Sequence, residues 1–176
     1  MYLRLFSLNS NSPERNGDNQ RTMSQPLSVF MGSAARSAIA ENGWRGAPIT
    51  TLIGASGGPK WLILSELDQV LASELLINNP RTITLLGSSI GTWRHACLSQ
   101  PDPVGAIKRL QRAYLGQEYS SPKPTPREVS TVAGQMLGEA LGQQGAQNLI
   151  RHPTLHNAIV TARAKGIARG QQGLSL

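Results

Sequence analysis

Two apolar runs, at residues 49–53 and 83–86, are each followed by a glycine-rich turn and then by a helical pattern. Short apolar runs bounded by turn residues predict buried strands. The order strand, turn, helix, strand, turn, helix predicts a mainly parallel sheet with right-handed crossover connections. We therefore expect an α/β protein, and the length of 176 residues suits one domain with a hydrophobic core.

The turn after the second run reads Gly-Ser-Ser-Ile-Gly at residues 87–91, and a helical stretch follows at 90–98. A G-x-S-x-G pattern between a strand and a helix is the context of a nucleophile elbow, in which the serine hydroxyl is exposed above the sheet. The flanking residues Gly87 and Gly91 let the backbone turn sharply without a Cβ clash. This pattern predicts Ser89 as a nucleophile.

The turn after the first run reads Gly-Ala-Ser-Gly-Gly-Pro-Lys at residues 54–60, and an apolar helical stripe follows at 59–76. Backbone N–H groups at a helix N-terminus attract negative charge. A serine nucleophile needs such donors for the oxyanion that develops on its substrate. We expect Gly57 and Gly58 to supply them, because both turns leave the sheet at its carboxyl edge.

The first turn has two alternative interpretations. It also spells G-x-S-x-G, which makes Ser56 a rival nucleophile, but no upstream glycine loop would then hold the oxyanion. We therefore prefer Ser89. A phosphate-binding loop does not fit, because Lys60 is followed by tryptophan rather than by serine or threonine.

Elsewhere the spacing of apolar residues and the capping residues predict further elements. A short strand is expected at 27–30, and helices are expected at 33–41, at 103–114, after a capping-box sequence at 125–128, and at 154–168. The strand signals fade after the elbow helix.

Residues 1–26 contain a segment rich in Ser, Asn, Pro, Arg and Gln, which predicts a disordered N-terminal extension. Either Met1 or Met23 could be the start, and the domain is expected over 27–176. The N-terminus lacks the continuous apolar segment of a secretory signal, and no apolar stretch approaches the roughly 20 residues that span a bilayer. We expect a cytoplasmic protein.

The formal net charge is +7, so nucleic acids and anionic lipids are possible partners. The basic residues are scattered, and no adjacent run is longer than Lys108-Arg109. Because no recognition motif accompanies the charge, we do not expect nucleic-acid binding. Peripheral contact with an anionic membrane surface is the expectation that remains.

The two turns together, Gly-Gly-Pro-Lys at 57–60 and Gly-Ser-Ser-Ile-Gly at 87–91, resemble the patatin-like phospholipases, in particular a bacterial branch of that family. The resemblance covers about residues 27–130 and is strongest at the turns. The family's oxyanion loop has the form G-G-G-x-R/K-G, and Ser56 and Trp61 stand where its first and last glycines would be.

The resemblance implies a three-layer α/β/α fold of patatin type, incomplete at its C-terminal side. It also implies hydrolysis of lipid acyl esters, such as phospholipids, by a Ser-Asp dyad without a catalytic histidine, metal or cofactor. Carried over by motif, Ser89 would be the nucleophile, and the oxyanion and substrate residues would be Gly57, Gly58, Lys60 and Ile90.

The dyad aspartate has no counterpart. In the family it follows the nucleophile in an Asp-Gly turn, whereas the aspartates here are Asp18, Asp68 and Asp102, and none precedes a glycine. We expect Asp68 to lie on a helix and Asp102 to be a turn residue. A shortened patatin domain with weak or no activity is predicted; the alternative is a non-catalytic fragment or pseudoenzyme that binds lipid surfaces at most.

Other reactive side chains are assigned structural roles. His95, His152 and His156 are expected to be exposed, and the last two make a poor zinc site because a proline separates them and no acidic ligand is near. The single cysteine, Cys97, is expected to be buried and fits a reducing compartment. Arg94 is expected at the surface or in a salt bridge.

Overall fold

The protein is described by a computed structural model that covers residues 29–46 and 48–163. Contacts divide the chain into two units, Met1–Gly32 and Ser33–Leu176. The expected extension at 1–26 lies outside the described residues. The strand expected at 27–30 is wrong for the two residues described there, because Val29 and Phe30 are exposed and belong to no strand.

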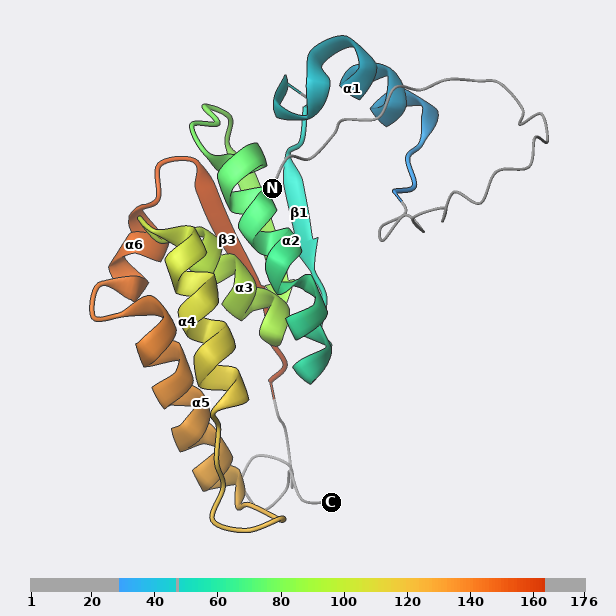
Figure 1. Ribbon diagram of the computed structural model, residues 1–176. Coiled ribbons are helices and arrows are strands. Elements are labelled where there is room, and N and C mark those ends of the chain that lie inside the picture. Colours follow the sequence, from blue (N-terminus) through green and yellow to red (C-terminus); the bar gives the residue numbers. More distant parts are fainter. Residues whose placement is uncertain (1–28, 47, 164–176) are drawn as a thin grey trace, which may run out of the picture. The chain divides into compact units, whose positions relative to one another are not determined.

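The described part of the second unit contains a three-stranded parallel sheet in the order β1-β2-β3. Its strands are β1 (Thr51–Gly54), β2 (Ile83–Ser88) and β3 (Leu155–Val160), shown in Figure 1. The first two strands pair in a register that aligns Gly54 with Gly87, so the two glycine-rich turns leave the sheet at the same edge. The predicted α/β class with a parallel sheet is confirmed.

Strand β3 corrects the prediction of a helix at 154–168, as far as residues 154–163 are described. Its six residues pair with β2, from Leu155 opposite Ile83 to Val160 opposite Ser88. The segment satisfies its backbone hydrogen bonds in the ladder and buries Leu155. The spacing of its apolar residues suggested a helix, but pairing with β2, which is distant in the sequence, stabilises a strand instead.

Between β1 and β2 the chain forms three short helical segments where the sequence predicted one regular helix. These are the 3₁₀ helix η1 (Gly58–Leu64), the α-helix α2 (Ser65–Val70) and the π-helix η2 (Leu71–Leu76). A 3₁₀ helix has about three residues per turn, so the apolar stripe changes phase. As a result Trp61 is buried, whereas Ile63, which was assigned to the stripe, is 84% exposed.

The remaining helices are α1 (Ser33–Gly46), α3 (Ile90–Leu98), α4 (Pro103–Leu115), α5 (Pro126–Leu141) and α6 (Gly145–Arg151). The bounds of α3 match the expectation, and α1 is interrupted at Gly43, where the sequence predicted its end. Capping side chains explain where α4 and α5 begin. Asp102 Oδ1 accepts the N–H of Gly105 at 2.9 Å, and Thr125 Oγ1 accepts the N–H of Glu128 at 3.2 Å.

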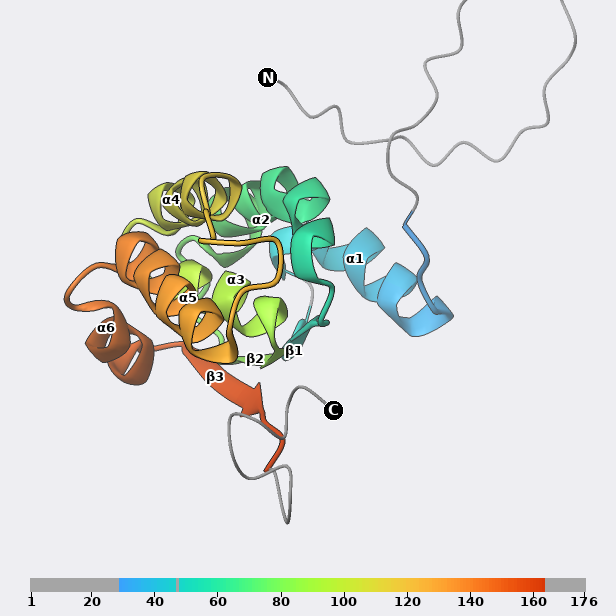
Figure 2. The ribbon, with the colours of Figure 1, turned by 90° about the horizontal axis from the view of Figure 1, so that it is seen from below.

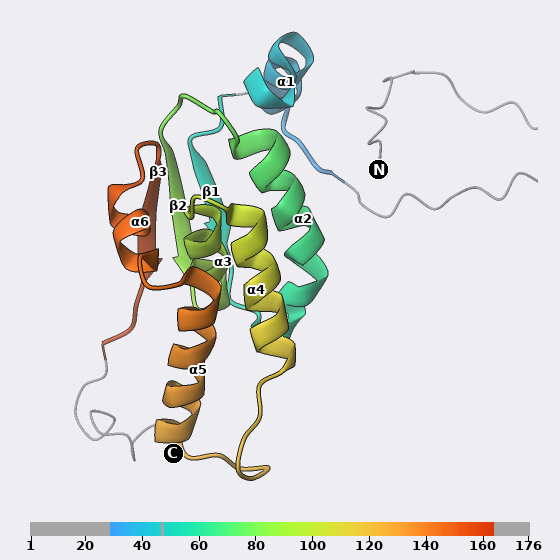
Figure 3. The same ribbon diagram turned by 60° about the vertical axis from the view of Figure 1, so that its left-hand side comes forward.

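Helices α2, α3, α4 and α5 lie on one side of the sheet (Figures 2 and 3). The other side is open in the described residues: Ile53, whose side chain alternates away from the helices, is 77% exposed. The second helical layer of a three-layer fold is not among the residues that the structure describes.

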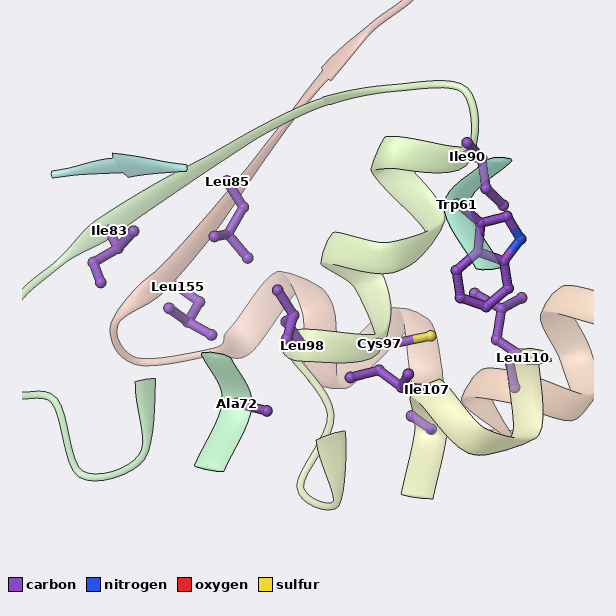
Figure 4. Packing of buried hydrophobic residues seen from close by; sticks show 12 residues of the cluster. Trp61, Ala72, Ile83, Leu85, Ile90, Cys97, Leu98, Ile107, Leu110 and Leu155 are labelled. Atoms are coloured by element: carbon purple, nitrogen blue, oxygen red, sulfur yellow. The ribbon is translucent and has the colours of Figure 1, made fainter. Parts of the chain in front are cut away.

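The core fills the space between the sheet and these helices (Figure 4). Trp61 packs edge-on against Tyr114 of α4, with ring centroids 5.7 Å apart. Ile90, at the start of α3, belongs to the same cluster, so the residues just beyond both glycine-rich turns are anchored in one core. Cys97 is fully buried, as expected, and burial raises the pKa of its thiol to about 12.

Candidate active site

Ser89 occupies the junction between β2 and α3 in a backbone conformation that serine rarely adopts. Its φ is 51° and its ψ is −129°. Within the described residues, Asn78 is the only other non-glycine residue with a positive φ. Such strain costs about 1–3 kcal/mol and persists only where the surrounding structure imposes it. The side chain is exposed, and the Ser89 carbonyl accepts the N–H of Thr92 at 2.9 Å, which closes the first turn of α3.

The two glycines of the elbow are required by close packing. A Cβ on Gly91 would overlap the carbonyl of Gly54, at the end of β1, and a Cβ on Gly87 would lie 2.7 Å from Cα of Thr92. Real Cβ atoms do not approach backbone atoms this closely. The helix after Ser89 therefore rests directly on the ends of two strands, and this contact holds the serine in its strained turn.

The first glycine-rich turn lies beside the elbow. A hydrogen bond of 2.7 Å joins the hydroxyls of Ser56 and Ser88, one from each turn. Gly58 has a φ of 52°, and the surroundings of Gly57 are open, since a Cβ there would meet nothing closer than Lys60 Cβ at 3.9 Å. This backbone is accessible to a ligand.

Both turns lead into the first turn of a helical segment, where backbone N–H groups are free of intrahelical bonds. The first N–H groups of a helix have no intrahelical acceptor, and η1 starts at Gly58 while α3 starts at Ile90. The N–H of Lys60 is already donated to the Gly57 carbonyl at 3.3 Å, and its side chain is exposed. Of the expected substrate residues, Gly57, Gly58 and Ile90 therefore lie at the starts of the two helical segments, and the Ile90 side chain is buried.

A base for Ser89 is missing from the described residues. Asp68 is buried in an ion pair with Arg94, and Asp102 caps α4. Residues 161–163, which follow β3 at the same edge of the sheet, include no acidic residue. Asp18 lies outside them.

His95 does not replace the base. The sequence predicted an exposed residue, but the side chain is 4% exposed, because α3 turns it under β1, where a Cβ on Gly54 would lie 2.8 Å from its Cε1. Burial, and next the positive charge of Arg94, lower the pKa of His95, while the negative charge of Asp68 acts in the opposite direction. Burial therefore favours the neutral form of its ring, which lies against Gly54 at the end of β1.

The other two histidines, His152 and His156, lie after α6 and in β3. His152 is partly buried, which corrects the expectation of an exposed side chain, and its Nδ1 accepts the N–H of Leu155 at 2.9 Å. Burial, followed by His156, lowers the pKa of His152. His156 itself is exposed, as expected. Among residues 29–46 and 48–163, no group of three His, Cys, Asp or Glu side chains could hold a metal ion.

A cavity of about 400 Å³ lies elsewhere on the second unit and includes no residue of either turn. It is lined by Ser99, Pro101, Gln144, Gln147, Asn148, Arg151, His152 and Pro153. In the described part of the chain, no helix is both long and apolar enough to cross a bilayer.

Comparison with protein-family models, curated proteins and solved structures finds no significant match for this chain. Support for a functional assignment therefore comes from the geometry of the two turns and from the resemblance of their sequences to the patatin-like phospholipases.

Proposed function

We propose that the protein is a serine acyl hydrolase of patatin type that acts on lipid esters, with Ser89 as the nucleophile. The observation that carries this proposal is the strained backbone of Ser89 at a strand-to-helix turn, beside an open glycine loop. Serine nucleophiles of elbow turns are held in this way so that the hydroxyl projects from the sheet. The rival Ser56 has no such backbone conformation.

In the proposed reaction Ser89 Oγ attacks the ester carbonyl, and the N–H groups of Gly57, Gly58 and Ile90 hold the oxyanion. The ester bond to the alcohol breaks, the alcohol leaves with a proton, and water then hydrolyses the acyl-enzyme. Because the described residues place no base beside Ser89, its proton passes to solvent and turnover is slow. The chain acts in the cytoplasm, in peripheral contact with anionic membranes.

The alternative is a pseudoenzyme that binds lipid surfaces without hydrolysing them. The absence of an acid or histidine beside Ser89 in the described residues favours it. It predicts that the chain sediments with anionic vesicles but releases no fatty acid.

Labelling with a fluorophosphonate, which mimics an ester and traps an activated serine, tests the choice. We expect the wild-type protein and Ser56→Ala to be labelled and Ser89→Ala to be unlabelled. Labelling that disappears only in Ser56→Ala would reassign the nucleophile. A folded wild-type protein that is not labelled at all would favour the pseudoenzyme.

A further inference from the structure

Asp68 in α2 and Arg94 in α3 form a buried, bidentate ion pair between two helices that make few other contacts with each other. Arg94 Nε donates to Asp68 Oδ2 at 2.6 Å, and Arg94 Nη2 donates to Asp68 Oδ1 at 2.6 Å. The Asp68 side chain is 1% exposed and that of Arg94 is 12% exposed. Two parallel hydrogen bonds from a planar guanidinium fix both the separation and the angle of the groups that they join.

Each member of the pair belongs to the helical segment that follows one of the two turns. Asp68 lies in α2, which continues directly from η1 and so from the Gly57-Gly58 loop. Arg94 lies in α3, which begins immediately after Ser89. The pair therefore connects the supports of the glycine loop and of the serine, behind the edge where the turns meet.

Stability alone is a weak explanation for this pair. Burying two charges is costly, and well-packed apolar residues often serve a fold equally well. The directional fork adds a defined geometry that apolar contacts lack. A fixed separation matters in a site where N–H donors must face the oxygen that a neighbouring nucleophile generates.

We propose that the Asp68–Arg94 pair is a positioning device, which holds the N–H groups of Gly57 and Gly58 in register with Ser89. The catalytic part of this inference rests on the proposed hydrolase function. The structural part, the coupling between the pair and the glycine loop, does not.

The test compares Asp68→Asn with Glu74→Gln. The first variant removes the charge from the buried pair, and the second removes it from the exposed Arg45–Glu74 pair, which has the same N–O distance of 2.6 Å but side chains that are 66% and 61% exposed. Amide hydrogen exchange at residues 60–64, the N–H groups of η1 that begin with the Lys60 N–H bonded to the Gly57 carbonyl, and the rate of fluorophosphonate labelling are measured for the folded fraction of each protein.

We expect faster exchange at residues 60–64 in Asp68→Asn, with labelling slowed by about 100-fold, the effect of misplacing a reacting group by about 1 Å. Glu74→Gln should match the wild type in both measurements. Unchanged exchange and labelling in folded Asp68→Asn would overturn the inference. So would exchange that accelerates equally throughout the core, which is what a merely structural role predicts.

A double variant, Asp68→Leu with Arg94→Met, keeps the test decisive if Asp68→Asn fails to fold. It replaces the pair by apolar side chains and is expected to fold, yet to exchange faster than the wild type at residues 60–64 and to be labelled slowly. Recovery of wild-type values in this variant would overturn the inference. If the wild type is not labelled but exchange at residues 60–64 still responds to Asp68→Asn, the hydrolase proposal fails while the coupling stands.

Discussion

The two glycine-rich turns share one five-residue pattern but have different backbones. Residues 54–58 and 87–91 both read G-x-S-x-G, and both leave parallel strands at the same edge of the sheet. In the second turn the serine, Ser89, has the positive φ. In the first turn Gly58 has it, and Ser56 does not. The pattern of residue types therefore does not identify the nucleophile, whereas the backbone distinguishes the two serines.

The difference arises from what each turn packs against. Gly91 contacts the carbonyl of Gly54, so α3 has no room to begin except through a sharp turn at Ser89. Nothing presses on Gly58 in the same way, and a 3₁₀ helix with Pro59 in its first turn follows it. One turn is tightly packed and presents a side chain, whereas the other is open and presents backbone N–H groups. The proposed hydrolase would use this division, with Ser89 as its nucleophile and the open turn as its oxyanion hole.

The largest expected effect comes from breaking the packed turn. Gly91→Ala places a Cβ on the Gly54 carbonyl, so it should destabilise the protein by about 3 kcal/mol. Gly57→Ala, in the open turn, should change the free energy of unfolding by less than about 1 kcal/mol. Urea unfolding followed by circular dichroism measures both. Equal effects would show that the two turns are not packed differently.

Smaller changes in stability are expected when each serine is replaced by glycine, and the two changes should have opposite signs. Ser89→Gly relieves the positive φ and should stabilise the protein by about 1 kcal/mol while it abolishes labelling. Ser56→Gly relieves no strain, frees the unfolded chain and loses the bond to Ser88, so it should destabilise by about 0.5–1 kcal/mol. Thermal melts of both variants check the signs. Destabilisation by Ser89→Gly would mean that the elbow is not strained.

The smallest expected effect is a pH dependence of stability caused by His95, whose ring lies against Gly54 at the end of β1. Its pKa in the folded protein is lowered from 6.5, mainly by burial, so the unfolded chain binds more protons between that lowered pKa and 6.5. Stability should be full above pH 6.5 and should fall as the pH drops below it. Urea midpoints between pH 8 and pH 5 measure this slope.

His95→Gln is the variant that isolates this residue, and it should flatten the slope. It should not abolish it, because the pKa of His152 is also lowered. A slope unaffected by His95→Gln, but removed by His152→Gln, would mean that His95 is accessible to protons in the folded state.

Much of the fold can be predicted from local signals. The β-branched runs predict β1 and β2, and the cap at Thr125 and the proline at position 103 predict the starts of α5 and α4. The third strand could not be predicted in this way. Residues 155–160 have a spacing compatible with a helix and become a strand only because the exposed edge of β2 is available.

The candidate site likewise has features that follow from local sequence and features that depend on tertiary contacts. The sequence by itself determined which residues stand at the ends of β1 and β2, since apolar runs, glycines and the helical pattern are local features. Only the tertiary structure decided that Ser89 carries the strain, that Ser56 bonds to the elbow instead, and that Asp68 and Arg94 join the helices behind both turns. These outcomes depend on contacts between segments far apart in the chain, and residue spacing along one segment does not contain that information.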